Sequence, residues 1–238
     1  MIAPLINRLY SPFCCLLFFF VSLLFLQVSL LADDSSKNVT IRIMLPLMPS
    51  GPLDCAVVTR DEEGQWKEHT PLNVRPAFIS KWIQVPRTEL GLRFQEDGEP
   101  LPVLSFMVHE EIKRALVVVL PGEEEGKFNT HIIDGEETTD FGAGDILLVN
   151  LSTVTCSVSL GDESTTAKPG DTLVARPSLD SNRMYQLLVG YKDGKDDLVT
   201  CHDRYVRPDQ SARGYLLLIH DPKNKVRVVR VTEFGKFE

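Results

Sequence analysis

Two apolar stretches that lie 99 residues apart decide the fold of this chain: RALVVVL at residues 114–120 and RGYLLLI at residues 213–219. Each is followed, after a short polar segment, by another β-rich stretch, KFNTHII at residues 127–133 and KVRVVRV at residues 225–231. Two such runs joined by a short turn segment are typical of a β-hairpin. The same hairpin is therefore expected twice.

Other segments repeat in the same order and at similar offsets. Three further pairs match: 54–58 with 155–159, 85–86 with 176–177, and 95–103 with 191–199. Ordered matches at nearly constant spacing favour an internal duplication. A single larger sandwich is the alternative at this length. The duplication predicts one domain at residues 39–136 and a second at 141–238, joined by the polar stretch 134–144.

The whole chain after Asp33 alternates short Val-, Ile- and Leu-rich runs with turns rich in Gly, Pro, Asp and Asn. Many short strands without a long helical period predict an all-β fold: two tandem immunoglobulin-like antiparallel β-sandwich domains after an N-terminal signal or anchor segment. Strands are expected at residues 39–45, 54–60, 77–85, 90–95, 115–120, 128–133, 145–151, 155–160, 171–176, 184–191, 198–201, 214–220 and 225–232.

The first 32 residues carry one charge, Arg8, and residues 13–32 are almost wholly apolar. A positive start followed by an apolar run is typical of an export signal. The run is also long enough to span a bilayer, so residues 1–32 are either a signal peptide cleaved after Ala32 or an uncleaved membrane anchor. Both interpretations place the rest of the chain outside the cytoplasm, in the periplasm, the cell envelope or the medium. The second adds membrane attachment through residues 13–32.

The charge balance excludes one class of partner. The 238 residues include 25 Lys and Arg against 33 Asp and Glu, a net charge of −8. Phosphate backbones are bound by clustered Lys and Arg, so no nucleic-acid partner is expected.

One part of the chain resembles a known group of proteins. Residues 141–152 (FGAGDILLVNLS), 160–162 (LGD) and 168–171 (KPGD) are similar to uncharacterised exported bacterial tandem β-sandwich proteins. In that group a strand ending in Asn-Leu-Ser precedes a short Pro-Gly turn. The resemblance covers residues 141–177 and implies export and fold, with no activity attached to it.

Three cysteines follow the apolar segment: Cys55, Cys156 and Cys201. Exported proteins form disulfides, and Cys156 and Cys201 fall in the same predicted domain, so one interpretation pairs them. The other interpretation is that they are buried thiols acting as small hydrophobic residues. The match of Cys55 with Cys156 in the duplication favours a packing role for Cys55.

The motifs of common enzyme classes do not occur in the sequence. There is no Gly-x-Ser-x-Gly, no phosphate-binding Gly-x-x-x-x-Gly-Lys-Ser/Thr, no dinucleotide fingerprint and no Cys-x-x-Cys. The five histidines lack the close spacing of a compact zinc motif. We therefore expect no enzyme activity, no catalytic residue, no metal and no cofactor. An extracellular hydrolase stays open, because a glycosidase needs only two carboxylates placed by the fold.

The two tryptophans, Trp66 and Trp82, suggest one ligand class. Exposed aromatic rings bind sugar rings, so both are candidates for a carbohydrate platform, while burial in the core is the ordinary alternative. The sequence thus predicts an exported, non-enzymatic structural or interaction module whose partner is a protein or glycan of the cell envelope. A polysaccharide-binding module is the second hypothesis.

Overall fold

The computed structural model describes residues 38–47, 53–74, 77–96, 99–122, 127–135, 140–194, 197–221, 223 and 225–234. The predicted signal or anchor at residues 1–32 lies outside these ranges, as does most of the predicted linker between 135 and 140. The described fold belongs to a unit that runs from Val39 to Glu238. Within the described ranges, no helix has the length and apolar character needed to cross a membrane.

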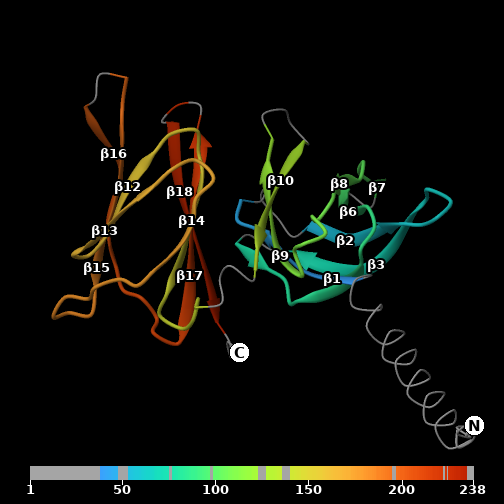
Figure 1. Ribbon diagram of the computed structural model, residues 1–238, viewed down its shortest axis with the longest axis horizontal. Coiled ribbons are helices and arrows are strands. Elements are labelled where there is room, and N and C mark those ends of the chain that lie inside the picture. Colours follow the sequence, from blue (N-terminus) through green and yellow to red (C-terminus); the bar gives the residue numbers. More distant parts are fainter. Residues whose placement is uncertain are drawn as a thin grey trace, which may run out of the picture. The chain divides into compact units, whose positions relative to one another are not determined.

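The first ten strands form two sheets (Figure 1). Sheet A has the order β10-β9-β1-β4, with β5 also paired to β1, and sheet B has the order β3-β2-β6-β7, with β8 also paired to β6. The strands are β1 (Asn38–Leu45), β2 (Leu53–Arg60), β3 (Trp66–Val74), β4 (Phe78–Ile79), β5 (Ile83–Pro86), β6 (Leu90–Glu96), β7 (Glu99–Pro100), β8 (Leu104–Phe106), β9 (Arg114–Pro121) and β10 (Phe128–Asp134).

The remaining strands form a second pair of sheets (Figure 1). Sheet C has the order β14-β11-β17-β18 and sheet D the order β13-β12-β15-β16. The strands are β11 (Ile146–Leu151), β12 (Cys156–Leu160), β13 (Glu163–Ala167), β14 (Thr172–Ala175), β15 (Tyr185–Lys192), β16 (Leu198–Val206), β17 (Ala212–Asp221) and β18 (Lys225–Phe234).

The two pairs of sheets have corresponding strand orders. The hairpin β9–β10 occupies in sheet A the place of β17–β18 in sheet C, and β3-β2-β6 corresponds to β13-β12-β15. Most neighbouring strands are antiparallel, as the sequence predicts. Two pairs, β1 with β9 and β11 with β17, are parallel. The first strand of each sandwich therefore pairs in parallel with a strand near the end of that sandwich. The alternation of apolar and polar residues along one strand does not reveal whether its neighbour is parallel or antiparallel.

Each pair of sheets encloses its own apolar core. Ile41 and Val117 from sheet A pack with Val57, Leu92 and Phe94 from sheet B, and all five side chains are almost inaccessible to solvent. In the second pair, the corresponding core contains Leu148, Leu216, Val158, Leu187 and Val189. Apolar burial between facing sheets is the dominant stabilising term of such a fold. The described part of the chain is thus all-β and forms two sandwiches, each a pair of facing sheets.

A third apolar cluster joins sheet A to sheet C. Leu116 and Val118 of β9 and Met44 of β1 belong to one buried cluster with residues of β11 and β17, including Leu147 and Leu217. The central strands of sheets A and C are therefore buried on both faces. Strands buried on both faces read as continuous apolar runs instead of alternating ones, and this explains why RALVVVL and YLLLI are unbroken.

Candidate functional site

A polar cluster surrounds the carboxylate of Glu233 on β18. Its oxygens accept hydrogen bonds from the Arg42 guanidinium, from Arg213 Nε at 2.7 Å and from Tyr215 Oη at 2.8 Å. Arg42 Nε also donates to the Ser80 carbonyl at 2.7 Å. Only 10% of the Arg42 side chain and 11% of the Glu233 side chain are exposed. Because β1 belongs to sheet A and β18 to sheet C, we call Arg42, Arg213, Tyr215 and Glu233 the inter-sandwich clasp.

The electrostatics of the clasp favour a structural role. Burial acts to raise the pKa of Glu233, but the hydrogen bonds from Arg213, Arg42 and Tyr215 outweigh it and lower that pKa. Burial raises the pKa of the Tyr215 hydroxyl well above its ordinary value. At neutral pH Glu233 is therefore ionised and Tyr215 remains a donor. The carboxylate is engaged by protein donors from both sandwiches.

Trp82 lies between β4 and β5, beside the clasp. The guanidinium carbon of Arg114 lies 4.6 Å from its ring centroid and that of Arg42 lies 5.3 Å from it. Both distances are within the range of cation–π contacts. The half-buried ring is thus already in contact with two protein cations, which a stacking sugar would have to displace.

Trp66 begins β3, the edge strand of sheet B, and is also half-buried. The guanidinium carbon of Arg60 lies 5.8 Å from its ring centroid. Trp82, by contrast, contacts Arg42, which projects from the face of sheet A that is turned away from sheet B. The structure therefore does not bring the two predicted platform residues together on one surface.

The three described cysteines, Cys55, Cys156 and Cys201, are free thiols. Cys156 lies on β12 and Cys201 on β16, and β15 runs between these strands. Two strands that flank a common neighbour are about 9–10 Å apart, whereas disulfide-bonded Cα atoms lie within about 7 Å. The structure places the predicted pair in one sheet but does not bring them to bonding distance.

The surroundings of these thiols explain their state. Cys201 is the extra residue of a β-bulge opposite Val189 and Gly190, and its thiol donates to the Val189 carbonyl at 3.3 Å. Burial raises the pKa of Cys201 and of Cys156, and it raises the pKa of Cys55 to about 12. Protonated, buried thiols are poor nucleophiles, so their contribution is to packing.

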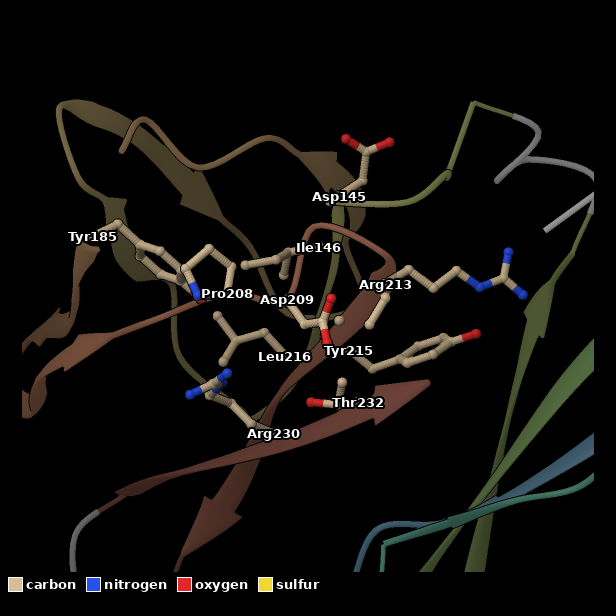
Figure 2. Close-up of a pocket in the computed structure, with 13 residues that line it drawn as sticks. Asp145, Ile146, Tyr185, Pro208, Asp209, Arg213, Tyr215, Leu216, Arg230 and Thr232 are labelled. Carbon is tan, nitrogen blue, oxygen red and sulfur yellow. The ribbon is translucent and has the colours of Figure 1, made fainter. Parts of the chain in front are cut away.

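A small cavity of about 30 Å³ lies at one end of the second sandwich (Figure 2). Such a volume holds about one or two water molecules. Figure 2 shows that the Arg213 and Tyr215 side chains extend to one side, the Arg230 side chain to the other, and the Asp145 carboxylate away from Leu216. The cavity is therefore too small for a substrate, and its charged groups diverge.

Asp145, at the rim of this cavity, is anchored in the fold. Its carboxylate accepts hydrogen bonds from Arg176 Nε at 2.7 Å and from the Gly142 backbone N–H at 2.9 Å. Burial acts to raise the pKa of Asp145, but these two hydrogen bonds outweigh it and lower that pKa. The ionised carboxylate thus fixes the entry to β11.

A larger, open cleft of about 660 Å³ shares Pro208 and Asp209 with the small cavity. It lies between the segment 176–184, which joins β14 to β15, and the segment 207–211, which joins β16 to β17. Its volume is in the range of small-molecule sites. We call it the arginine cleft, and its lining residues are Leu179, Asn182, Arg183, Arg207, Pro208, Asp209 and Gln210.

The two loops of the arginine cleft are held by their own carboxylates. Asp180 Oδ1 accepts hydrogen bonds from the backbone N–H groups of Asn182 at 2.9 Å and Met184 at 2.8 Å. Asp209 Oδ1 accepts from the backbone N–H of Ser211 at 2.9 Å and from its hydroxyl at 2.6 Å. These hydrogen bonds lower the pKa of Asp209. Both carboxylates therefore stabilise turns.

Arg183 has an unusual backbone conformation, with φ at 57°. This left-handed region favours Gly and Asn and costs other L-residues about 1–2 kcal/mol. The arginine closes a turn in which the Asp180 N–H donates to the Met184 carbonyl at 2.7 Å. Strained backbone conformations are concentrated at functional sites, and this strained residue lines the arginine cleft.

The two arginines of the cleft differ in their partners from the arginines of the first sandwich. Within the described ranges, the guanidiniums of Arg183 and Arg207 have no hydrogen bond, ion pair or ring contact. Arginines of the first sandwich are engaged: Arg42 by Glu233, Arg60 by Glu89, Arg87 by the carbonyls of His109 and Ile112, Arg93 by the Trp66 carbonyl and Arg114 by the Trp82 ring. Two arginines without a partner among the described residues therefore line the same cleft.

Sequence reasoning missed both groups of charged residues. The signal for the arginine cleft was present in SNRM at residues 181–184 and RPDQ at residues 207–210, where an arginine adjoins turn-forming residues. No such signal marks the clasp, because Arg42 and Glu233 are 191 residues apart and meet only in the folded chain. In the part of the chain that the structure describes, no three His, Cys, Asp or Glu side chains are grouped as a metal site.

No protein-family model matches this chain, and no curated protein is similar to it. Its function is therefore inferred from its own residues.

Proposed function

We propose that this protein is an exported, non-enzymatic structural and interaction module of the cell envelope. In this proposal two tandem immunoglobulin-like domains, at residues 39–136 and 141–238, follow a signal peptide or membrane anchor at residues 1–32. The apolar run at 13–32 supports export. The corresponding strand orders of the two sandwiches support a duplicated domain.

The observation that carries the proposal is the contrast between the clasp and the arginine cleft. The clasp residues are buried and bonded to one another, so they hold the two sandwiches in one unit. The cleft guanidiniums are exposed and, among the described residues, unpaired, on loops that turn hydrogen bonds fix. Function on such a scaffold resides in loops that the rigid sheets position. A partner of the cell envelope, either a protein or a glycan, is therefore expected to bind at these loops.

The charged groups also favour binding over hydrolysis. A glycosidase needs a carboxylic acid whose pKa is raised so that it can protonate the leaving group. Where the pKa of a described carboxyl group is shifted, it is lowered, as in Asp145, Asp209 and Glu233. These groups are ionised and engaged in hydrogen bonds, which supports a non-enzymatic role over an extracellular hydrolase.

A polysaccharide-binding module is the second candidate. Asn182 and Gln210 line the arginine cleft, and their amide groups can hydrogen-bond to sugar hydroxyls. Trp66 and Trp82 support this candidate less, since each ring already lies beside a guanidinium.

Export can be tested in cells with the full-length chain fused after Glu238 to a reporter enzyme that is active only outside the cytoplasm. The proposal predicts reporter activity and cleavage of the fusion by protease added to cells with a permeabilised outer envelope. A variant with Leu23→Arg and Leu24→Arg interrupts the apolar run and is expected to abolish both signals. An inactive, protease-resistant fusion in the cytosol, with residues 1–32 still attached, would contradict the proposal.

A further inference from the structure

We infer that the arginine cleft binds an anionic glycan, a polysaccharide whose sugars carry carboxylate or phosphate groups. The inference rests on the proposed function, because it assigns a chemical class to the partner of the exported module.

The cationic groups of the cleft are of the chemical type that binds oxyanions. Arg183 and Arg207 reach the cleft from two different loops, so one ligand can contact both. A guanidinium donates two parallel hydrogen bonds to a carboxylate or phosphate group, which a lysine cannot do. Neither guanidinium has a partner among the described residues, so no intramolecular ion pair has to be broken on binding.

Among the described residues, the acidic groups near the cleft form no ion pair with its two arginines. Asp209 is the only acidic lining residue among those described, and its Oδ1 is engaged by Ser211. Asp180, next to the lining residues, bonds to the backbone of its own turn. Arg230 lines the small cavity that shares Pro208 and Asp209, so it adds positive charge near the same loop.

The uncharged groups of the cleft fit a sugar. Asn182 and Gln210 supply amides that can donate to and accept from hydroxyl groups. Leu179 and Pro208 supply apolar surface for the C–H faces of a sugar ring. The described lining contains no aromatic ring, and stacking on aromatic rings is the usual means of holding single-stranded nucleic acid. The mixture of guanidinium, amide and apolar groups thus matches an anionic sugar.

A hydrogen-bonded turn fixes the backbone of Arg183 in the cleft. Arg183 stays in the left-handed conformation because Asp180 bonds to both ends of the turn. A glycine there would fit the backbone better but would lack the guanidinium. The turn fixes the backbone from which the Arg183 side chain projects before a ligand binds, and this lowers the conformational entropy lost on binding.

Calorimetric titration of the full-length chain in a neutral detergent tests the inference. The probes are polygalacturonate, which carries carboxylates, a phosphorylated mannan, and dextran as the uncharged control. We expect at least one anionic glycan to bind, with an affinity that falls as salt rises, and dextran not to bind. The stronger of the two anionic probes identifies the preferred oxyanion.

Three variants assign this binding to the cleft. Arg183→Gly relieves the backbone strain while removing the charge, and Arg207→Ala removes the second guanidinium; each is expected to weaken binding at least tenfold. Arg227→Ala removes another exposed arginine, on β18, that does not line the cleft, and is expected to change affinity less than twofold. Unchanged circular dichroism, and a thermal midpoint no lower than that of the wild type, establish that each variant is folded.

Several results would overturn the inference. These are equal loss of affinity in Arg227→Ala and the cleft variants, equal binding of dextran, or binding to phosphatidylglycerol vesicles with none to either anionic glycan. Absence of binding to both glycans would also refute it. Each of these results leaves the reporter-fusion experiment unaffected, so failure of the glycan assignment is distinguishable from failure of the exported-module proposal.

Discussion

Glu233 is the residue on which the connection between the sandwiches depends. It accepts hydrogen bonds from Arg42 of the first sandwich and from Arg213 and Tyr215 of its own sheet. A buried charge is tolerated only when opposite charges and donors surround it. Removing the Glu233 carboxylate would therefore deprive the guanidiniums of Arg42 and Arg213 of their acceptor at a largely buried position.

We predict that Glu233→Gln lowers the free energy of unfolding by about 3 kcal/mol, because it breaks a buried pair from one side. Urea denaturation of the full-length chain measures this change. The matched control is Glu89→Gln, which removes the partner of Arg60 in an exposed pair and should cost less than about 1 kcal/mol. Similar losses of unfolding free energy in both variants would show that the buried ion pair stabilises the fold no more than the exposed one.

The clasp also predicts a pH dependence. The pKa of Glu233 is lower in the folded chain than its ordinary value of 4.5. Its ionised form therefore contributes stability that is present above pH 4.5 and is lost as the pH falls through the folded-state pKa. The stability difference between the wild type and Glu233→Gln should shrink over this acidic range. A difference that is constant down to acid unfolding would contradict the assignment.

The charged residues could not have been predicted from the sequence as completely as the core. Arg42 looks like one polar position in an alternating strand, and Glu233 lies one residue beyond the predicted strand 225–232. Their pairing depends on how sheets A and C pack, which neither local pattern contains. Arg183 and Arg207 were within reach of sequence reasoning, since turn residues surround them, but their shared cleft depends on two loops far apart in sequence.

At the scale of elements, central strands were predictable and polar edge strands were not. The observed β9, β11 and β17 fall within or close to the predicted ranges because their apolar runs are long. β3 (WKEHTPLNV) and β13 (ESTTA) were missed, because each is an edge strand with many exposed polar side chains. The predicted strand 77–85 is interrupted, since Ser80 is buried and its hydroxyl accepts the Ile43 N–H.

The turn between β12 and β13 provides a test at this scale. Gly161 has φ at 72°, and a Cβ built on it would lie 2.2 Å from the Ser178 carbonyl oxygen. Gly161→Ala should therefore cost about 3 kcal/mol, as strain in the backbone and overpacking combine. The control is Gly170→Ala, where φ is 87° but nothing lies within 4 Å; its backbone strain should cost about 1 kcal/mol. Thermal unfolding measures both, and equal losses would refute the close contact.

The order of strands in sheet D predicts the redox state of its cysteines. Because β15 separates β12 from β16, we expect Cys156 and Cys201 to remain free thiols in the purified protein. Thiol titration of the denatured chain without reductant, with the labelled residues located by mass spectrometry, measures this. A Cys156–Cys201 disulfide in the isolated protein would contradict the strand order.

At the scale of the whole molecule, the third apolar cluster and the clasp make residues 39–238 one unit. The sequence indicated two similar halves through the repeated hairpin. It gave no sign that the outer faces of β9 and β17 would pack together, because a continuous apolar run is equally expected of a strand covered by other elements. The loops of the second sandwich are therefore carried by a unit in which both sandwiches share apolar packing.

Equilibrium urea unfolding of the full-length chain, followed by two local probes, tests this unit most directly. Tryptophan fluorescence reports on the first sandwich through Trp66 and Trp82, and thiol labelling at Cys156 and Cys201 reports on the second. We predict that the two probes change at the same urea concentration and that Glu233→Gln shifts both midpoints together. Two separate transitions, with the second sandwich unfolding independently of the first, would contradict the account.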